Sequence, residues 1–141
     1  MRNILGSIGV GTVMAAMLGC GPLPPTPVDN TIDPATPAFY STNVLPIFQK
    51  YCYRCHGGIN HRGGLRMSTH AGMMRGGRDG QVLVPGDPAA SLLVKLIRHE
   101  GTDERPGPMP SRSRKLSDAD IATVERWVRA GAVMPPDSPV K

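Results

Sequence analysis

Five consecutive residues combine two thiols and an imidazole: Cys52-Tyr53-Arg54-Cys55-His56. Side chains three and four residues apart lie on one side of a helix, so Cys52, Cys55 and His56 can converge on one edge of a flat cofactor. The C-x-x-C-H order is the pattern that attaches a c-type haem, because two thiols bind its vinyl groups and the imidazole binds its iron. We therefore predict one covalent haem c with its iron, held by Cys52, Cys55 and His56.

Other interpretations of the two thiols stay open. A thioredoxin-like dithiol has the same C-x-x-C spacing, but it occurs in a βαβ context, and the flanks here are predicted helical. A zinc site needs further ligands, and the chain has no second Cys pair, while His61 and His70 lie in a glycine-rich stretch without paired spacing. A chance match is the third alternative.

A second candidate iron ligand is Met109, which lies between Pro108 and Pro110. Proline fixes its own φ and keeps the preceding residue extended, so these prolines would present the thioether of Met109 at a fixed place. A Met that only fills a gap in a loop is the alternative. The rival ligands are a His, which would give a lower potential, or one of the other methionines: Met67, Met73, Met74 and Met134.

Helices are predicted on both sides of these candidate ligands. An apolar face of Val44, Ile47, Phe48 and Tyr51 predicts a helix that begins near Ser41–Asn43 and runs directly into Cys52. Asp87 as N-cap and Pro88 at the first position predict a second helix that ends near Gly101; its buried stripe is Leu92, Leu93, Leu96 and Ile97.

The last predicted helix runs from Ser117 to about Ala130. Ser117 is its N-cap, and Asp120 three residues later makes a pattern like a capping box. Its inner face consists of Ile121, Val124, Trp127 and Val128. Between the first two helices, the glycine-rich stretch 57–80 is predicted to be a loop with one short helix at 68–74, capped by Ser68 or Thr69.

Residues 1–19 have the features of an export signal. Arg2 precedes an apolar, glycine-interrupted stretch that is too short to favour a spanning helix. The run Met17-Leu18-Gly19-Cys20 then resembles a bacterial lipoprotein signal, whose processing leaves a lipidated Cys as the first residue. We expect an exported protein that is anchored to a bacterial membrane through Cys20 and faces the periplasm or cell surface. An ordinary secretory signal and an uncleaved anchor stay open.

The rest of the chain divides by composition into a linker and one folded domain. Residues 20–38 are rich in proline, which predicts an extended, semi-rigid linker without a core of its own. Residues 39–141 are predicted to form the domain. The aromatic content of the chain is only 4%, so a bound haem would supply a large part of the apolar interior.

The charge of the chain favours a protein partner over nucleic acid. The formal net charge is +5, and no basic run with interleaved aromatics indicates nucleic-acid binding. One or two arginines of the 57–80 stretch are candidates to pair with haem propionates. An excess of basic side chains predicts an acidic redox partner: Arg62, Arg66, Arg75, Arg78, Arg112, Arg114 and Lys115.

The segment from Val44 to Met134 resembles the planctomycete-type cytochrome c domain, a branch of the class I cytochromes c. The stretches that carry the resemblance are residues 52–57, 63–67, 84–88 with 91–93, 108–110, 116–118 and 127–132. The resemblance implies an all-α, class I cytochrome c-like fold, with three to four helices around a covalent haem. It also implies that the first and last helices cross near Phe48 and Trp127, and that His56 is the proximal and Met109 the distal ligand.

Three functions are compatible with these features. A haem with both His and Met ligands has no open site, which favours a membrane-anchored carrier of single electrons. A peroxidase-like haem enzyme would need a displaceable sixth ligand and a distal acid–base group, for which His61, His70 and His99 are the candidates. A haem-based sensor or interaction module would use the same displaceable ligand.

Overall fold

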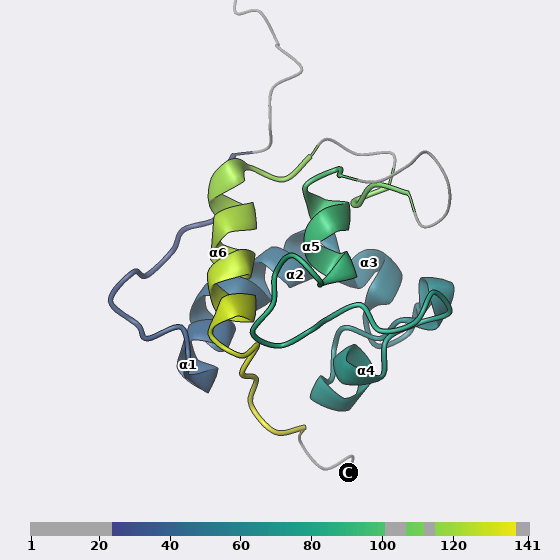
Figure 1. Cartoon of the computed structure of the whole chain (residues 1–141), viewed down its shortest axis with the longest axis horizontal. Helices are drawn as coiled ribbons and strands as arrows, with labels where there is room; N and C mark the ends of the chain where they lie inside the picture. The colour runs from purple at the N-terminus through teal and green to yellow at the C-terminus, as the bar shows by residue number, and fades with distance from the viewer. Residues whose placement is uncertain (1–23, 101–106, 112–114, 138–141) are drawn as a thin grey trace, which may run out of the picture.

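The computed structural model describes residues 24–100, 107–111 and 115–137 (Figure 1). Over these residues the chain is helical and has no β-strand beyond one isolated bridge between Gly77 and Gly80, in agreement with the predicted all-α class. None of the described helices is long and apolar enough to span a membrane. The elements, in order, are α1 (Pro37–Phe39), a π-helical turn (Tyr40–Val44), α2 (Leu45–Tyr51), α3 (Tyr53–His56), a 3₁₀ turn (Arg62–Gly64), α4 (His70–Arg75), α5 (Leu92–Ile97) and α6 (Asp118–Arg129).

The first helical run begins earlier than predicted. Thr36 is its N-cap and Pro37 occupies the first turn, so the predicted start at residues 41–43 is wrong. Asn43 is fully buried instead, and its side-chain amide bonds both backbone groups of Asp29, at 2.7 and 2.9 Å. The π-helical turn precedes Pro46; because proline lacks an N–H and crowds the carbonyl four residues back, a wider turn accommodates it.

The described part of the proline-rich segment lies against the helices. Asn43 holds Asp29, as above, and Arg126 of α6 donates to Asn30 Oδ1 over 2.7 Å. Figure 1 shows this segment passing the start of α6 and then looping out to the side before it reaches α1. The boundary between a linker at 20–38 and a domain at 39–141 stays a prediction, but residues 24–36 are bonded to the helices that follow them.

Three aromatic rings join the N-terminal helices to α6. The centroid of the Trp127 ring lies 5.8 Å from that of Phe48, edge to face, and 5.5 Å from that of Tyr40. Such contacts stabilise beyond the area they bury. The indole N–H of Trp127 donates to Val133 O over 2.9 Å. The predicted contact between the first and last helices at Phe48 and Trp127 is therefore confirmed.

Helix α5 is shorter than predicted at its N-terminal end. Asp87 caps only a turn, by accepting from the N–H of Ala90 over 2.9 Å, and the helix begins after Ser91. The buried hydroxyl of Ser91 contacts Val84 N at 2.9 Å and Asp87 O at 2.8 Å, which satisfies backbone groups around the turn. At the other end, His99 takes a left-handed backbone (φ 58°) after Ile97. Gly101, the predicted terminator, lies outside the described residues.

The predicted N-caps of α4 and α6 are both present, but the predicted capping box at the start of α6 is incomplete. Thr69 accepts from Gly72 N–H at the start of α4, and Ser117 accepts from Asp120 N–H at the start of α6, both at 3.0 Å. The carboxylate of Asp120 does not complete the box; its Oδ1 accepts the N–H of Thr26 over 2.8 Å.

Candidate functional site

One cavity of about 1320 Å³ brings together the four predicted haem-site residues Cys52, Cys55, His56 and Met109. Small-molecule pockets usually measure roughly 300–1,000 Å³, so this space suits a large cofactor. Much of the remaining wall is apolar and comes from α5 and from several loops: Leu65, Met67, Val82, Leu92, Leu93, Leu96, Ile97 and Leu116.

The two cysteines and His56 are placed by one helical turn. Cys52 ends α2, where its N–H donates to Phe48 O over 2.8 Å. The N–H groups of Cys55 and His56 then both donate to Cys52 O, at 3.0 and 2.9 Å. This turn places all three side chains on the cavity, as the spacing predicts.

The environment of Cys52 does not suit a reactive thiol. Burial, with a smaller effect of Cys55, raises the pKa of the Cys52 thiol to about 12. Because the thiolate is both the nucleophile and the metal ligand, a thiol held protonated is poorly suited to redox exchange or to zinc. A thioether carries no proton and is compatible with these apolar surroundings. In the described part of the chain, no three or more His, Cys, Asp or Glu side chains group as a metal site.

His56 has the chemistry of a metal ligand. Burial lowers its pKa, and the backbone of Arg62 and Leu65 acts in the opposite direction. The neutral imidazole that burial favours is the form that binds metals. Its Nδ1 is buried and has no hydrogen-bond partner among the described residues. This is unusual for a buried polar atom. A neutral imidazole with an unsatisfied nitrogen, in a cavity wall with two thiols, fits a haem.

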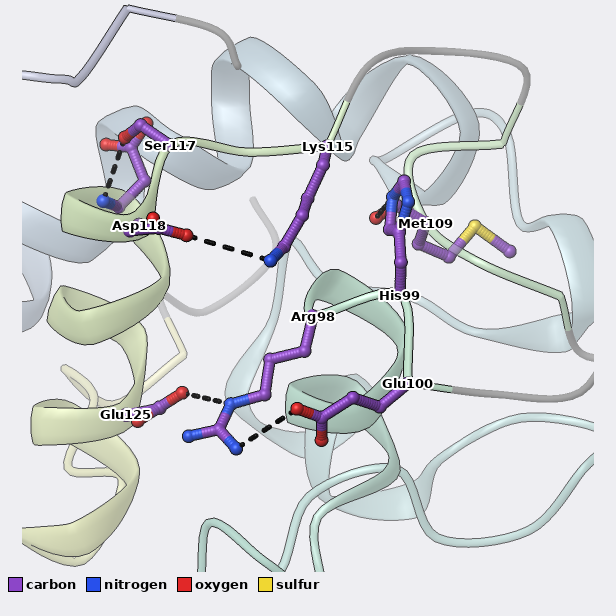
Figure 2. Close-up of polar contacts among 9 residues, drawn as sticks. Arg98, His99, Glu100, Met109, Lys115, Ser117, Asp118 and Glu125 are labelled. Carbon is purple, nitrogen blue, oxygen red and sulfur yellow. Dashed lines mark hydrogen bonds and ion pairs between the residues drawn. The ribbon is translucent and has the colours of Figure 1, made fainter. Parts of the chain in front are cut away.

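Met109 lines the cavity and lies beside the C-terminal end of α5. Its N–H donates to Leu96 O over 3.0 Å, and its carbonyl lies 3.1 Å from the Nε2 of His99 (Figure 2). Among its rivals, Met67 also lines the cavity, whereas Met73 is buried in the core and Met74 and Met134 pack against that core. The position of Met109 agrees with a distal ligand, and the ligation itself stays a prediction.

The histidines considered as distal acid–base groups lie outside the cavity wall. His61 accepts from the guanidinium of Arg66 over 3.0 Å, His70 is exposed at the start of α4, and His99 contacts the carbonyl of Met109.

Among the described residues, three cationic side chains and one acid, Asp79, line the cavity. Of the arginines predicted to meet the propionates, Arg62 is in this wall, whereas Arg66, Arg75 and Arg78 are not. Lys50 and Arg54 are the other two, and sequence reasoning missed them. Their spacing of four residues, on the helical run that ends at His56, is the signal that could have found them.

Comparison with known proteins gives one match. Residues 52–110 match the model of a family described as planctomycete cytochrome C. The matched segment begins at Cys52 and ends at Pro110, so it contains both cysteines, His56 and Met109. No curated protein and no solved structure matches the chain.

Proposed function

We propose, on the basis of the match of residues 52–110 to the planctomycete cytochrome C family, that the chain carries a haem-binding cytochrome c domain and is a carrier of single electrons. In this proposal one covalent haem c is attached through Cys52 and Cys55 and ligated by His56 and Met109. The observation that carries the proposal is that these four side chains line one cavity. When bound, the haem supplies reversible one-electron chemistry at iron.

Each group of residues has a distinct task in this proposal. Cys52 and Cys55 would hold the cofactor through thioethers, and His56 would supply an imidazole ligand to its iron. Met109 would supply a neutral thioether as the second protein ligand, which would leave no coordination position for a substrate and would raise the reduction potential. The apolar side chains of α5 in the cavity wall would pack against the cofactor. The exposed cations Lys50, Arg54 and Arg62 offer charge for propionates and for an acidic redox partner.

The proposed cellular setting comes from the sequence alone. Residues 1–23 lie outside the described residues. We propose that Cys20 is lipidated and anchors the domain to a bacterial membrane, on the periplasmic or outer surface. Attachment of haem c in bacteria takes place outside the cytoplasmic membrane, which is consistent with export.

The experiment that tests attachment is acid–acetone extraction of the purified protein followed by denaturing electrophoresis. Haem bound through two thioethers stays on the chain. Cys52→Ala and Cys55→Ala should each weaken that retention, and the double variant should abolish it. Haem that extracts fully from the wild type, or a folded double variant that keeps it, would refute covalent attachment.

The visible spectrum of the reduced protein, recorded with and without carbon monoxide, separates a closed carrier site from a displaceable one. A closed site gives the same spectrum in both. A rapid change on addition of carbon monoxide would favour the sensor or peroxidase-like alternative.

A further inference from the structure

The main chain of Met109 is held at both of its polar groups by the end of α5. Its N–H donates to Leu96 O, and its carbonyl accepts from the Nε2 of His99 (Figure 2). A carbonyl can only accept a hydrogen bond, so Nε2 must carry the proton. Figure 2 shows the thioether pointing away from Glu125 and α6, and Met109 lines the cavity.

His99 reaches this position through an unfavourable backbone conformation. Its φ of 58° is left-handed, where a side chain with a Cβ is disfavoured. Its own N–H donates to Leu96 O over 3.2 Å, the same carbonyl that holds Met109. Unfavourable conformations of this kind persist where the surrounding contacts require them, often at functional positions.

The residues on both sides of His99 are fixed as well. The guanidinium of Arg98 contacts Glu125 of α6 at 2.5 Å and Glu100 at 3.5 Å. The N–H of Glu100 donates to Lys95 O over 2.9 Å. The two residues that flank His99 are therefore held by contacts with both α5 and α6 (Figure 2).

We propose that His99 is a positioning residue, whose hydrogen bond to the Met109 carbonyl holds the thioether at the sixth coordination position of the haem. This role of His99 rests on the proposed His/Met ligation, and it adds a residue that strengthens the binding of Met109 to the iron. Partners behind a ligand restrict its orientation, so their loss weakens metal binding. Without His99, the N–H of Met109 would be the one main-chain contact left to hold the ligand among the described residues.

Two substitutions separate the hydrogen bond of His99 from its backbone conformation. His99→Gln keeps an N–H donor at a similar distance from Cα but does not favour a left-handed φ. His99→Asn tolerates a left-handed φ but is too short to reach the carbonyl. His99→Gly is a second variant without a donor, and it removes the backbone cost.

The readouts, taken on the full haem-loaded chain, are the weak red absorbance band of iron–sulfur ligation in the oxidised form and carbon monoxide binding to the reduced form. We expect His99→Asn and His99→Gly to weaken the binding of Met109 to iron about 10–100-fold, with loss of the band and faster carbon monoxide binding. His99→Gln should stay close to the wild type. His70→Asn, at an exposed His of α4, is the matched control.

Two results would overturn the positioning role of His99. One is a wild-type band in His99→Asn and His99→Gly; the other is equal behaviour of His99→Gln and His99→Asn. Absence of the band from the wild type would instead refute the proposed ligation, so the two failures are distinguishable.

Discussion

Thr26 donates its backbone N–H to the Oδ1 of Asp120 over 2.8 Å, across 94 positions of the chain. Both residues are buried, and neither Asp120 Oδ2 nor the hydroxyl of Thr26 has a hydrogen-bond partner among the described residues. This contact attaches the proline-rich segment to the first turn of α6, the helix whose Trp127 meets Phe48.

Loss of this acceptor should destabilise the protein. Asp120→Ala leaves the N–H of Thr26 buried and unpaired, so we expect the free energy of unfolding to fall by about 1–3 kcal/mol. Asp120→Asn keeps an acceptor oxygen and should cost less. Denaturant unfolding of the haem-loaded protein measures both.

The control for Asp120 is Asp118→Ala, in the same helical turn. Asp118 is exposed, and among the described residues its ion-pair partner is Lys115, at 3.6 Å (Figure 2), so its loss should change stability by less than about 0.5 kcal/mol. An equal cost at positions 118 and 120 would contradict the role given to Thr26.

Local signals in the sequence predicted the helices well, whereas contacts between distant segments decided where several of them begin or end. Thr69 and Ser117 cap helices within three residues of themselves, so their role could be predicted. Asn43 was predicted as a cap but bonds Asp29, fourteen positions away, and no local pattern indicates that pairing.

The same distinction holds at the site. The C-x-x-C-H spacing and the two prolines around Met109 are local signals, and the structure places Cys52, Cys55, His56 and Met109 on one cavity. The contact of His99 with Met109 depends on a left-handed turn at the end of α5 and on the path of the chain back to it. Neither is encoded in residue spacing, so the sequence could not predict that contact.

The exposed cations at the cavity should steer electron transfer. We expect the reduced protein to react with the anion ferricyanide at a rate that falls as ionic strength rises, because salt screens the attraction. Arg54→Ala should slow the reaction at low salt and leave it unchanged at high salt. Arg75→Ala, at an exposed arginine outside the cavity wall, is the control; a rate independent of salt would mean that these charges serve only solubility.

Cys20 is expected to fix the protein to a membrane. Cys20→Ser removes the thiol that would be lipidated, so we expect the domain to leave the membrane fraction or its signal to stay uncleaved. Mass spectrometry of the mature N-terminus gives the direct measurement. An unmodified Cys20, or a different first residue, would contradict the anchor.

The proposal of a closed electron carrier depends most on Met109. A neutral thioether binds iron without releasing a proton, so the reduced spectrum of the wild type should change little through the neutral pH range, unlike that of a His-ligated haem. Met67, which also lines the cavity, provides the matched comparison through Met67→Leu, which should keep the wild-type spectrum and potential.

The most direct measurement is the absorbance spectrum of Met109→Ala in both oxidation states. The account predicts loss of the weak red band of iron–sulfur ligation, a lower reduction potential and new binding of carbon monoxide to the reduced form. If Met109→Ala keeps the wild-type red band and reduction potential, the proposed ligation by Met109 is contradicted, because another residue would then be the sixth ligand of the iron.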